Sequence, residues 1–180
     1  MEKTKENIEK LVRQVAESRQ NYLEVVAQFS ETQAQFKPNP ESWNAIEVTE
    51  HLFWAEQGGI LGMWKTYNAI KAGQLPRRFD SVHQNLPIET IIERTWQAKE
   101  QVPAVAAPRF GGPIAFWASS LASLQTLLTQ FGEQMTDEDL RLQAHPHPIS
   151  GAMDFQQRIE FLRFHIDRHY LQVEKLLTQP

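Results

Sequence analysis

Two histidines near the end of the chain, His165 and His169, are four residues apart in a stretch whose pattern predicts a helix. A helix turns by about 100° per residue, so side chains four apart lie one above the other on the same face. Leu162, Ile166 and Val173 recur at helical spacing and make that face apolar. Two buried imidazoles need hydrogen-bond partners or a metal ion. The spacing alone favours neither a metal site nor a pair of hydrogen-bonded core histidines.

A third histidine, His51, lies in another predicted helix. Counting from it by helical steps gives Val48, Ala55, Gly58 and Gly62, which form a strip of small residues. This strip leaves space in front of the imidazole, or it lets another helix pack closely. Both interpretations remain open at this point.

Three histidines match the ligand count of a catalytic zinc-type site, which has three protein ligands and one open position. The chain has no cysteine, so any metal site must use His, Asp or Glu. It has no His-Glu-x-x-His, no Glu-x-x-His leading to these histidines and no Gly-x-Ser-x-Gly. Without these motifs, the remaining possibilities are metal chemistry or no catalysis. No residue is predicted to be catalytic, and no organic cofactor is expected.

The remaining histidine pair, His145 and His147, is a poor candidate for a metal site. Each residue precedes a proline, which restricts it to extended geometry. Residues two apart in an extended chain do not share a face. We therefore expect a rigid loop there.

The pattern predicts an all-α protein, a four-helix bundle with one additional short helix between the second and third long helices. The expected long helices cover residues 4–29, 43–72, 113–131 and 154–178. Residues 30–42 are expected to be a connection and 136–140 a short capped turn. The Pro- and Gly-rich insertion at 73–113 carries the short helix, 87–101, and is expected to pack over the bundle within a single domain, 1–180.

Several side chains are expected to cap these helices. Thr4 is a candidate N-cap of the first helix, and Pro87 is expected at the first position of the short one. Capping boxes are predicted for Asn44 with Glu47 and for Asp154 with Gln157.

Length and charge exclude other classes. The 180 residues suit one domain, and a net charge of −4 argues against a nucleic-acid surface. No apolar run approaches the ~20 residues that span a bilayer, and the charged N-terminus lacks a signal-peptide core. We expect a cytoplasmic protein that does not act on nucleic acid or membranes.

Two motifs together resemble the DinB-like family of metal-binding four-helix bundles, over about residues 4–178. They are Trp43-Asn44-x-x-Glu47-x-x-x-His51-Leu52 and His165-x-x-x-His169-x-x-Gln172. The resemblance implies a divalent metal, zinc or nickel, held by His51, His165 and His169. Relatives include thiol-dependent S-transferases and putative metal-dependent hydrolases, and many have no known activity. The 73–113 insertion is longer than a minimal member needs, so the resemblance does not extend to the substrate.

Three hypotheses follow for function. The first is an enzyme in which the metal activates a thiol or water toward a small-molecule substrate. The second is a stress-response module that binds metal or a small ligand without turnover, and the third is a bundle that the metal only stabilises. A homodimer formed through the short helix 87–101 is compatible with each.

Ligating histidines usually donate their second N–H to an acceptor. The candidate acceptors are Glu47, Glu50, Asp167 and Gln172. Gln172 is best placed, one turn beyond His169. Asp167 is about 200° around the helix from His165 and is expected to face solvent. Glu47 is already explained by the predicted capping box.

Other side chains could contribute to a substrate pocket. The candidates are Trp43, Trp54 and Trp117 for its walls and Arg77, Arg78, Arg109 and Arg168 for an anionic group. Aromatic residues at helical spacing are more often core, and arginines are more often solvated surface.

Overall fold

A computed structural model describes residues 5–97 and 101–179. In these ranges the chain is helical and contains only isolated β-bridges. Four long helices form the bundle: α1 (Glu6–Val26), α3 (Ala45–Lys71), α5 (Ile114–Gln134) and α6 (Phe155–Leu177). The shorter elements are α2 (Glu31–Gln35), α4 (Ile88–Thr95) and two 3-10 turns, η1 (Ala104–Ala106) and η2 (Asp139–Arg141). The predicted all-α bundle is confirmed.

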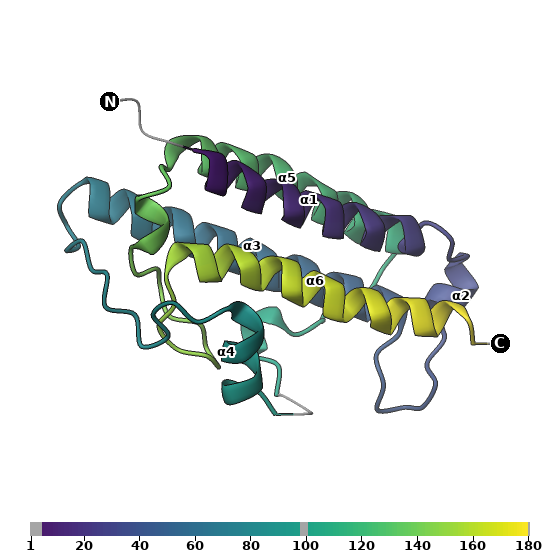
Figure 1. Cartoon of the computed structure of the whole chain (residues 1–180). Coiled ribbons are helices and arrows are strands. Elements are labelled where there is room, and N and C mark those ends of the chain that lie inside the picture. Colours follow the sequence, from purple (N-terminus) through teal and green to yellow (C-terminus); the bar gives the residue numbers. More distant parts are fainter. Residues whose placement is uncertain (1–4, 98–100, 180) are drawn as a thin grey trace.

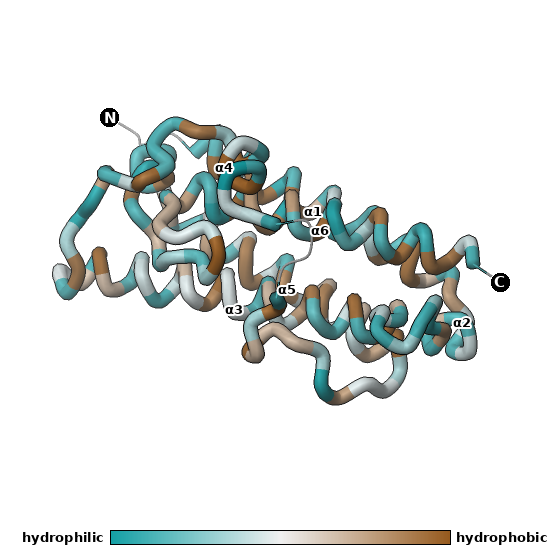
Figure 2. The backbone as a smooth tube through the Cα atoms, turned by 90° about the horizontal axis from the view of Figure 1, so that it is seen from below, coloured by the Kyte–Doolittle hydropathy of each residue, from teal (hydrophilic) through white to brown (hydrophobic). Residues whose placement is uncertain are grey.

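Each long helix contacts two others. Helices α1 and α3 both pack against α5 and α6, so α1 and α3 occupy opposite corners of the bundle (Figure 1). Apolar and polar residues are interspersed along these helices (Figure 2), and most of the buried apolar ones meet in one large core cluster. This arrangement places α3 beside α6, which is the pairing that brings the three candidate histidines onto facing surfaces.

The predicted capping boxes at Asn44–Glu47 and Asp154–Gln157 are both present. They fix the starts of α3 and α6, the two helices that carry the histidines. The proposed cap Thr4 lies outside the described residues. At the start of α1, the carboxylate of Asp137 accepts hydrogen bonds from the backbone N–H groups of Asn7 and Ile8.

Two predicted segments differ from the structure. Residues 30–42 contain the short helix α2, which begins with a capping box between Ser30 and Gln33. The short helix of the insertion begins at Ile88, with Pro87 as its N-cap, and ends at Thr95 rather than at residue 101. It ends early because Trp96 turns extended and its indole N–H donates to Ser150 Oγ, which seats the ring beside Phe161. Residues 98–100 of the predicted helix lie outside the described residues.

Helix α4 lies on the side of α6 that faces away from α1 (Figure 1). Its apolar residues form a second, smaller core cluster with Met153 and Phe161. The insertion therefore covers the bundle along the first half of α6. Of the described helices, none has an apolar stretch long enough to cross a membrane.

Candidate metal centre

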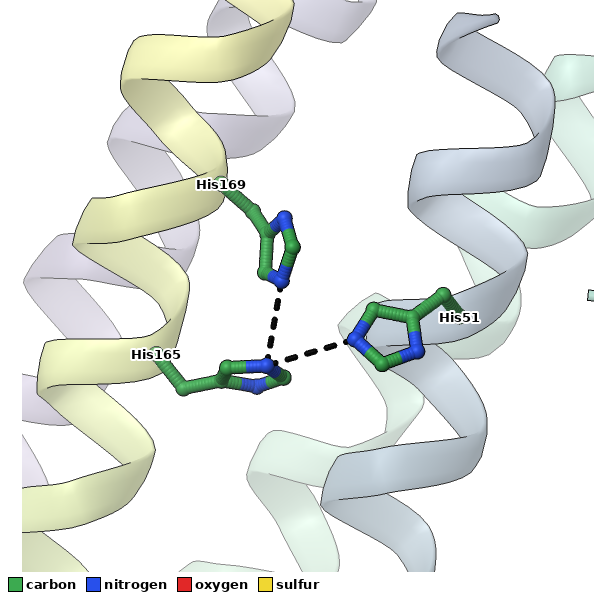
Figure 3. Close-up of side chains that lie close together, drawn as sticks. All are labelled: His51, His165 and His169. Atoms are coloured by element: carbon green, nitrogen blue, oxygen red, sulfur yellow. Dashed lines mark hydrogen bonds between the residues drawn. The ribbon is translucent and has the colours of Figure 1, made fainter. Parts of the chain in front are cut away.

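Three imidazoles meet between α3 and α6. His51 extends from α3, and His165 and His169 extend from α6 toward it (Figure 3). The Nε2 atom of His165 lies 3.3 Å from that of His51 and 3.0 Å from that of His169. All three side chains are buried, with residue exposures of 5 to 7%. The structure thus brings together the three histidines that the motifs single out.

A backbone carbonyl fixes the orientation of His51. Its Nδ1 donates to the Ala106 carbonyl oxygen over 2.8 Å, and a carbonyl can only accept. The proton therefore lies on Nδ1 and leaves Nε2 with a free lone pair. No sequence pattern indicates this acceptor, because it belongs to the backbone of the irregular insertion.

Glu50 holds the loop that supplies this carbonyl. Its carboxylate accepts hydrogen bonds from the backbone N–H groups of Arg109, Phe110 and Gly111. Burial alone would raise the pKa of Glu50, but these hydrogen bonds hold it below its ordinary value. Glu50, predicted to accept directly from a histidine, instead positions the loop whose carbonyl orients His51.

Gln172 orients the second imidazole, as predicted. The Nδ1 atom of His169 donates to Gln172 Oε1 over 2.9 Å, so Nε2 of His169 also carries a lone pair. The other two candidate acceptors have different roles. Glu47 completes its capping box and pairs with Lys37, and Asp167 pairs with Arg163.

The bonding of the cluster suits a cation better than a proton. Two of the three Nε2 atoms present lone pairs to His165 Nε2, which could satisfy only one of them with a single N–H. In the other contact, two nitrogen lone pairs would face and repel each other. A metal ion accepts a lone pair from each imidazole, so these residues fit a metal as a donor set.

The electrostatics of the cluster favour the ligating form of histidine. Burial lowers the pKa of His51, lowers that of His169 to about 3 and holds that of His165 well below its ordinary value. The proximity of the other imidazoles lowers the last two further. Neutral imidazoles at pH 7 are the form that binds metals.

The histidines form one wall of a cavity of about 770 Å³. Trp43 and Trp54 also line it, as proposed from the sequence, whereas Trp117 belongs to the core. The Trp43 ring lies 5.0 Å from that of His51. The centre is therefore both shielded by aromatic side chains and reachable by a small molecule.

Of the four candidate arginines, only Arg168 lines this cavity, where its guanidinium lies over the Trp96 ring. Arg109 stacks on Trp54 from the loop, and Arg77 pairs with Asp139.

The small residues near His51 have separate roles. Ala55 and Gly58 line the cavity, so this part of the strip leaves the predicted space in front of the imidazole. Gly62 instead packs against the ring of His145, which fills the position that a Cβ would occupy. His145 and His147 lie in the loop expected there and are not part of the three-histidine group.

Replacing Gly62 with alanine is expected to destabilise the fold by about 1–3 kcal/mol, because the new Cβ would lie 2.4 Å from His145 Nε2. Gly58→Ala is the matched control, since nothing lies within 4 Å of its Cβ position. The control should gain up to about 1 kcal/mol from helix propensity. Urea unfolding measures both changes, and equal effects of the two substitutions would contradict the packing described here.

Comparison with known proteins agrees with this architecture. The family model described as DinB superfamily matches residues 14–173. A solved structure, of a conserved protein from Enterococcus faecalis, is similar over 94% of both chains with a TM-score of 0.54 and 13% identity. At that identity the likeness concerns the fold alone. No curated protein matches the chain.

Proposed function

The chain belongs to the DinB superfamily, and from that premise we propose that it is a metal-dependent enzyme whose divalent ion is held by His51, His165 and His169. The observation that carries the proposal is the meeting of three buried Nε2 atoms at the wall of a cavity large enough for a small molecule.

The donor set argues for the kind of metal. Imidazole nitrogen suits zinc, nickel, copper and iron, whereas magnesium and calcium prefer oxygen ligands. The three-histidine group contains no carboxylate and the chain has no cysteine. The donor set therefore favours a transition metal, and we propose zinc or nickel because these are the ions that the family resemblance implies.

Such a metal, when bound by three protein ligands, lowers the pKa of a water or thiol and so supplies a nucleophile near pH 7. The proposed reaction is accordingly transfer of a low-molecular-weight thiol to an electrophile, or hydrolysis. The protein residues contribute by orienting the ligands and shaping the cavity. Ala106 and Gln172 fix two of the imidazoles, while Trp43 and Trp54 exclude bulk water from one side of the cavity.

The test is turnover by metal-loaded protein. We expect zinc- or nickel-loaded wild type to consume a thiol together with a small electrophile, or to hydrolyse an ester, and His51→Ala to lose that activity. Substitution of His83, which bonds Ser150 outside the cluster, should leave the rate unchanged.

The two other hypotheses predict different results. A module that binds without turnover would hold the metal yet stay inactive against a broad panel of thiols and esters. A metal that only supports the fold would be held without turnover and would, on removal, lower the melting temperature sharply. Absence of turnover in the metal-loaded protein would overturn the enzyme proposal, whereas a lower melting temperature alone would not, because any ion that binds only the folded chain stabilises it.

A further inference from the structure

Arg158 is a buried cation that pairs with no carboxylate of the residues that the structure describes. It lies on α6, its residue exposure is 5%, and no ion pair joins it to any acidic residue in the described part of the chain. One hydrogen bond is made, from Nη2 to His145 Nε2 over 2.8 Å. Its Nε and Nη1 atoms are buried and have no hydrogen-bond partner among the described residues.

This arrangement is unfavourable for stability. Burying a charge without a counter-ion costs several kcal/mol as a rule. Burial lowers the pKa of Arg158 to about 10, which still leaves the guanidinium charged at pH 7. The other fully buried arginine, Arg19, shows the usual solution, because it pairs with Glu56 and bonds Gln125. For Arg158, one neutral imidazole serves a group with five N–H donors.

Arg158 lines the same cavity as the histidines. Residues 158, 162, 165 and 169 follow one face of α6, and the seven helical steps from Arg158 to His165 span about 10 Å along the helix. Helix α3 approaches this face closely at Gly59, where a Cβ would lie in van der Waals contact, 3.7 Å from Arg158 Nη2. Among the described residues, the lining includes a second arginine, Arg168, and one acidic residue, Glu41.

We propose that Arg158 is an anion-binding subsite of this cavity, and that it takes the carboxylate of a substrate whose other end reaches the three histidines. The proposal rests on the proposed function for the role of that other end. A carboxylate can accept two parallel hydrogen bonds from a guanidinium, which gives orientation as well as affinity. His145 holds Nη2 in the ligand-free protein, and the carboxylate replaces its Nε2 as the acceptor. Apolar and aromatic neighbours such as Phe161 and Leu162 suit an organic acid rather than an inorganic anion.

Benzoate and benzamide provide a matched pair of probes, because they share a shape and differ in charge. We would titrate each into chelator-treated protein and follow tryptophan fluorescence, since Trp43, Trp54 and Trp96 line the cavity. Wild type is expected to bind benzoate at least about tenfold more tightly than benzamide, the usual effect of a hydrogen bond to a charged group. Arg158→Met should lose this preference.

Two controls make the result specific. Arg163→Met removes the same charge from α6 at a residue that pairs with Glu89 and Asp167, so its benzoate preference should equal that of wild type. Arg158→Met should melt no lower than wild type in buffer without small carboxylates, which shows that it folds.

Equal affinity for the two probes, no saturable binding of benzoate, or a preference that survives in Arg158→Met would each overturn the proposal. Loss of the preference in Arg168→Met alone would do so as well, by assigning the anion to the other arginine. Because these titrations use metal-free protein, and the preference should persist in His165→Ala, failure of the metal site would leave this result intact. Failure of the subsite would likewise leave metal binding untouched.

Discussion

Replacing His165 with alanine is expected to abolish metal binding while the bundle stays folded. His165 is the middle residue of the cluster, because its Nε2 lies within 3.3 Å of both other Nε2 atoms. Its removal leaves two ligands on separate helices. Alanine is a strong helix former, and the core cluster that joins the long helices does not include the histidines. Elemental analysis should find one metal ion per chain in wild type and a background level in the variant.

Two further variants test whether the loss of metal is specific to this cluster. Gln172→Ala keeps all three imidazoles but removes the acceptor that orients His169, and such outer partners are typically worth about 10- to 100-fold in metal affinity. His83→Ala removes a histidine outside the cluster and should bind metal as wild type does. If His165→Ala binds as much metal as wild type, the ion binds at another site and this prediction is wrong.

The bundle was predictable because its determinants are local. Apolar residues at helical spacing mark the long helices, and two capping boxes mark where α3 and α6 begin. The same pattern at Ser30 and Gln33 indicates the start of α2, which the predicted connection over 30–42 omits. The early end of α4 was not predictable in this way, because it depends on Trp96 bonding to Ser150, 54 residues away in sequence.

The candidate site likewise contains features that local sequence predicts and features that depend on tertiary packing. His165 and His169 share a face by helix geometry alone, and Gln172 follows from the same geometry. That His51 meets them requires α3 to pack beside α6, which only the family resemblance indicated. The Ala106 carbonyl could not be foreseen, because side-chain identity carries no information about where an irregular backbone places its oxygen.

Arg158 illustrates a different limit. It lies seven residues before His165, so its position on the same face could be counted from the sequence. What the sequence could not show is that no carboxylate of residues 5–97 and 101–179 pairs with it, because that depends on every element packed around it. The unpartnered charge becomes visible only in three dimensions.

Metal-free protein is expected to lose stability steeply as the pH falls below about 6.5. An unfolded histidine has a pKa near 6.5, whereas burial lowers that of folded His169 to about 3. Between these values the unfolded chain binds more protons, so acid favours unfolding. This contribution is fully present above pH 6.5 and is lost as the pH falls toward 3. At pH 5, His169 alone should cost roughly 2 kcal/mol, at 1.36 kcal/mol per pKa unit, and the shifts of His51 and His165 act in the same direction.

Urea unfolding in the presence of a chelator, at pH 7.5 and at pH 5, measures this loss. His169→Leu removes one titrating group, so its loss between the two pH values should be smaller than that of wild type by about the same 2 kcal/mol. Equal losses in the two proteins would show that His169 is already accessible to protons in the fold. Metal-loaded wild type should lose even more over this interval, because protons compete with the ion for the same nitrogens. A steeper curve with metal than without it would therefore tie the acid sensitivity of the fold to the three imidazoles that hold the ion.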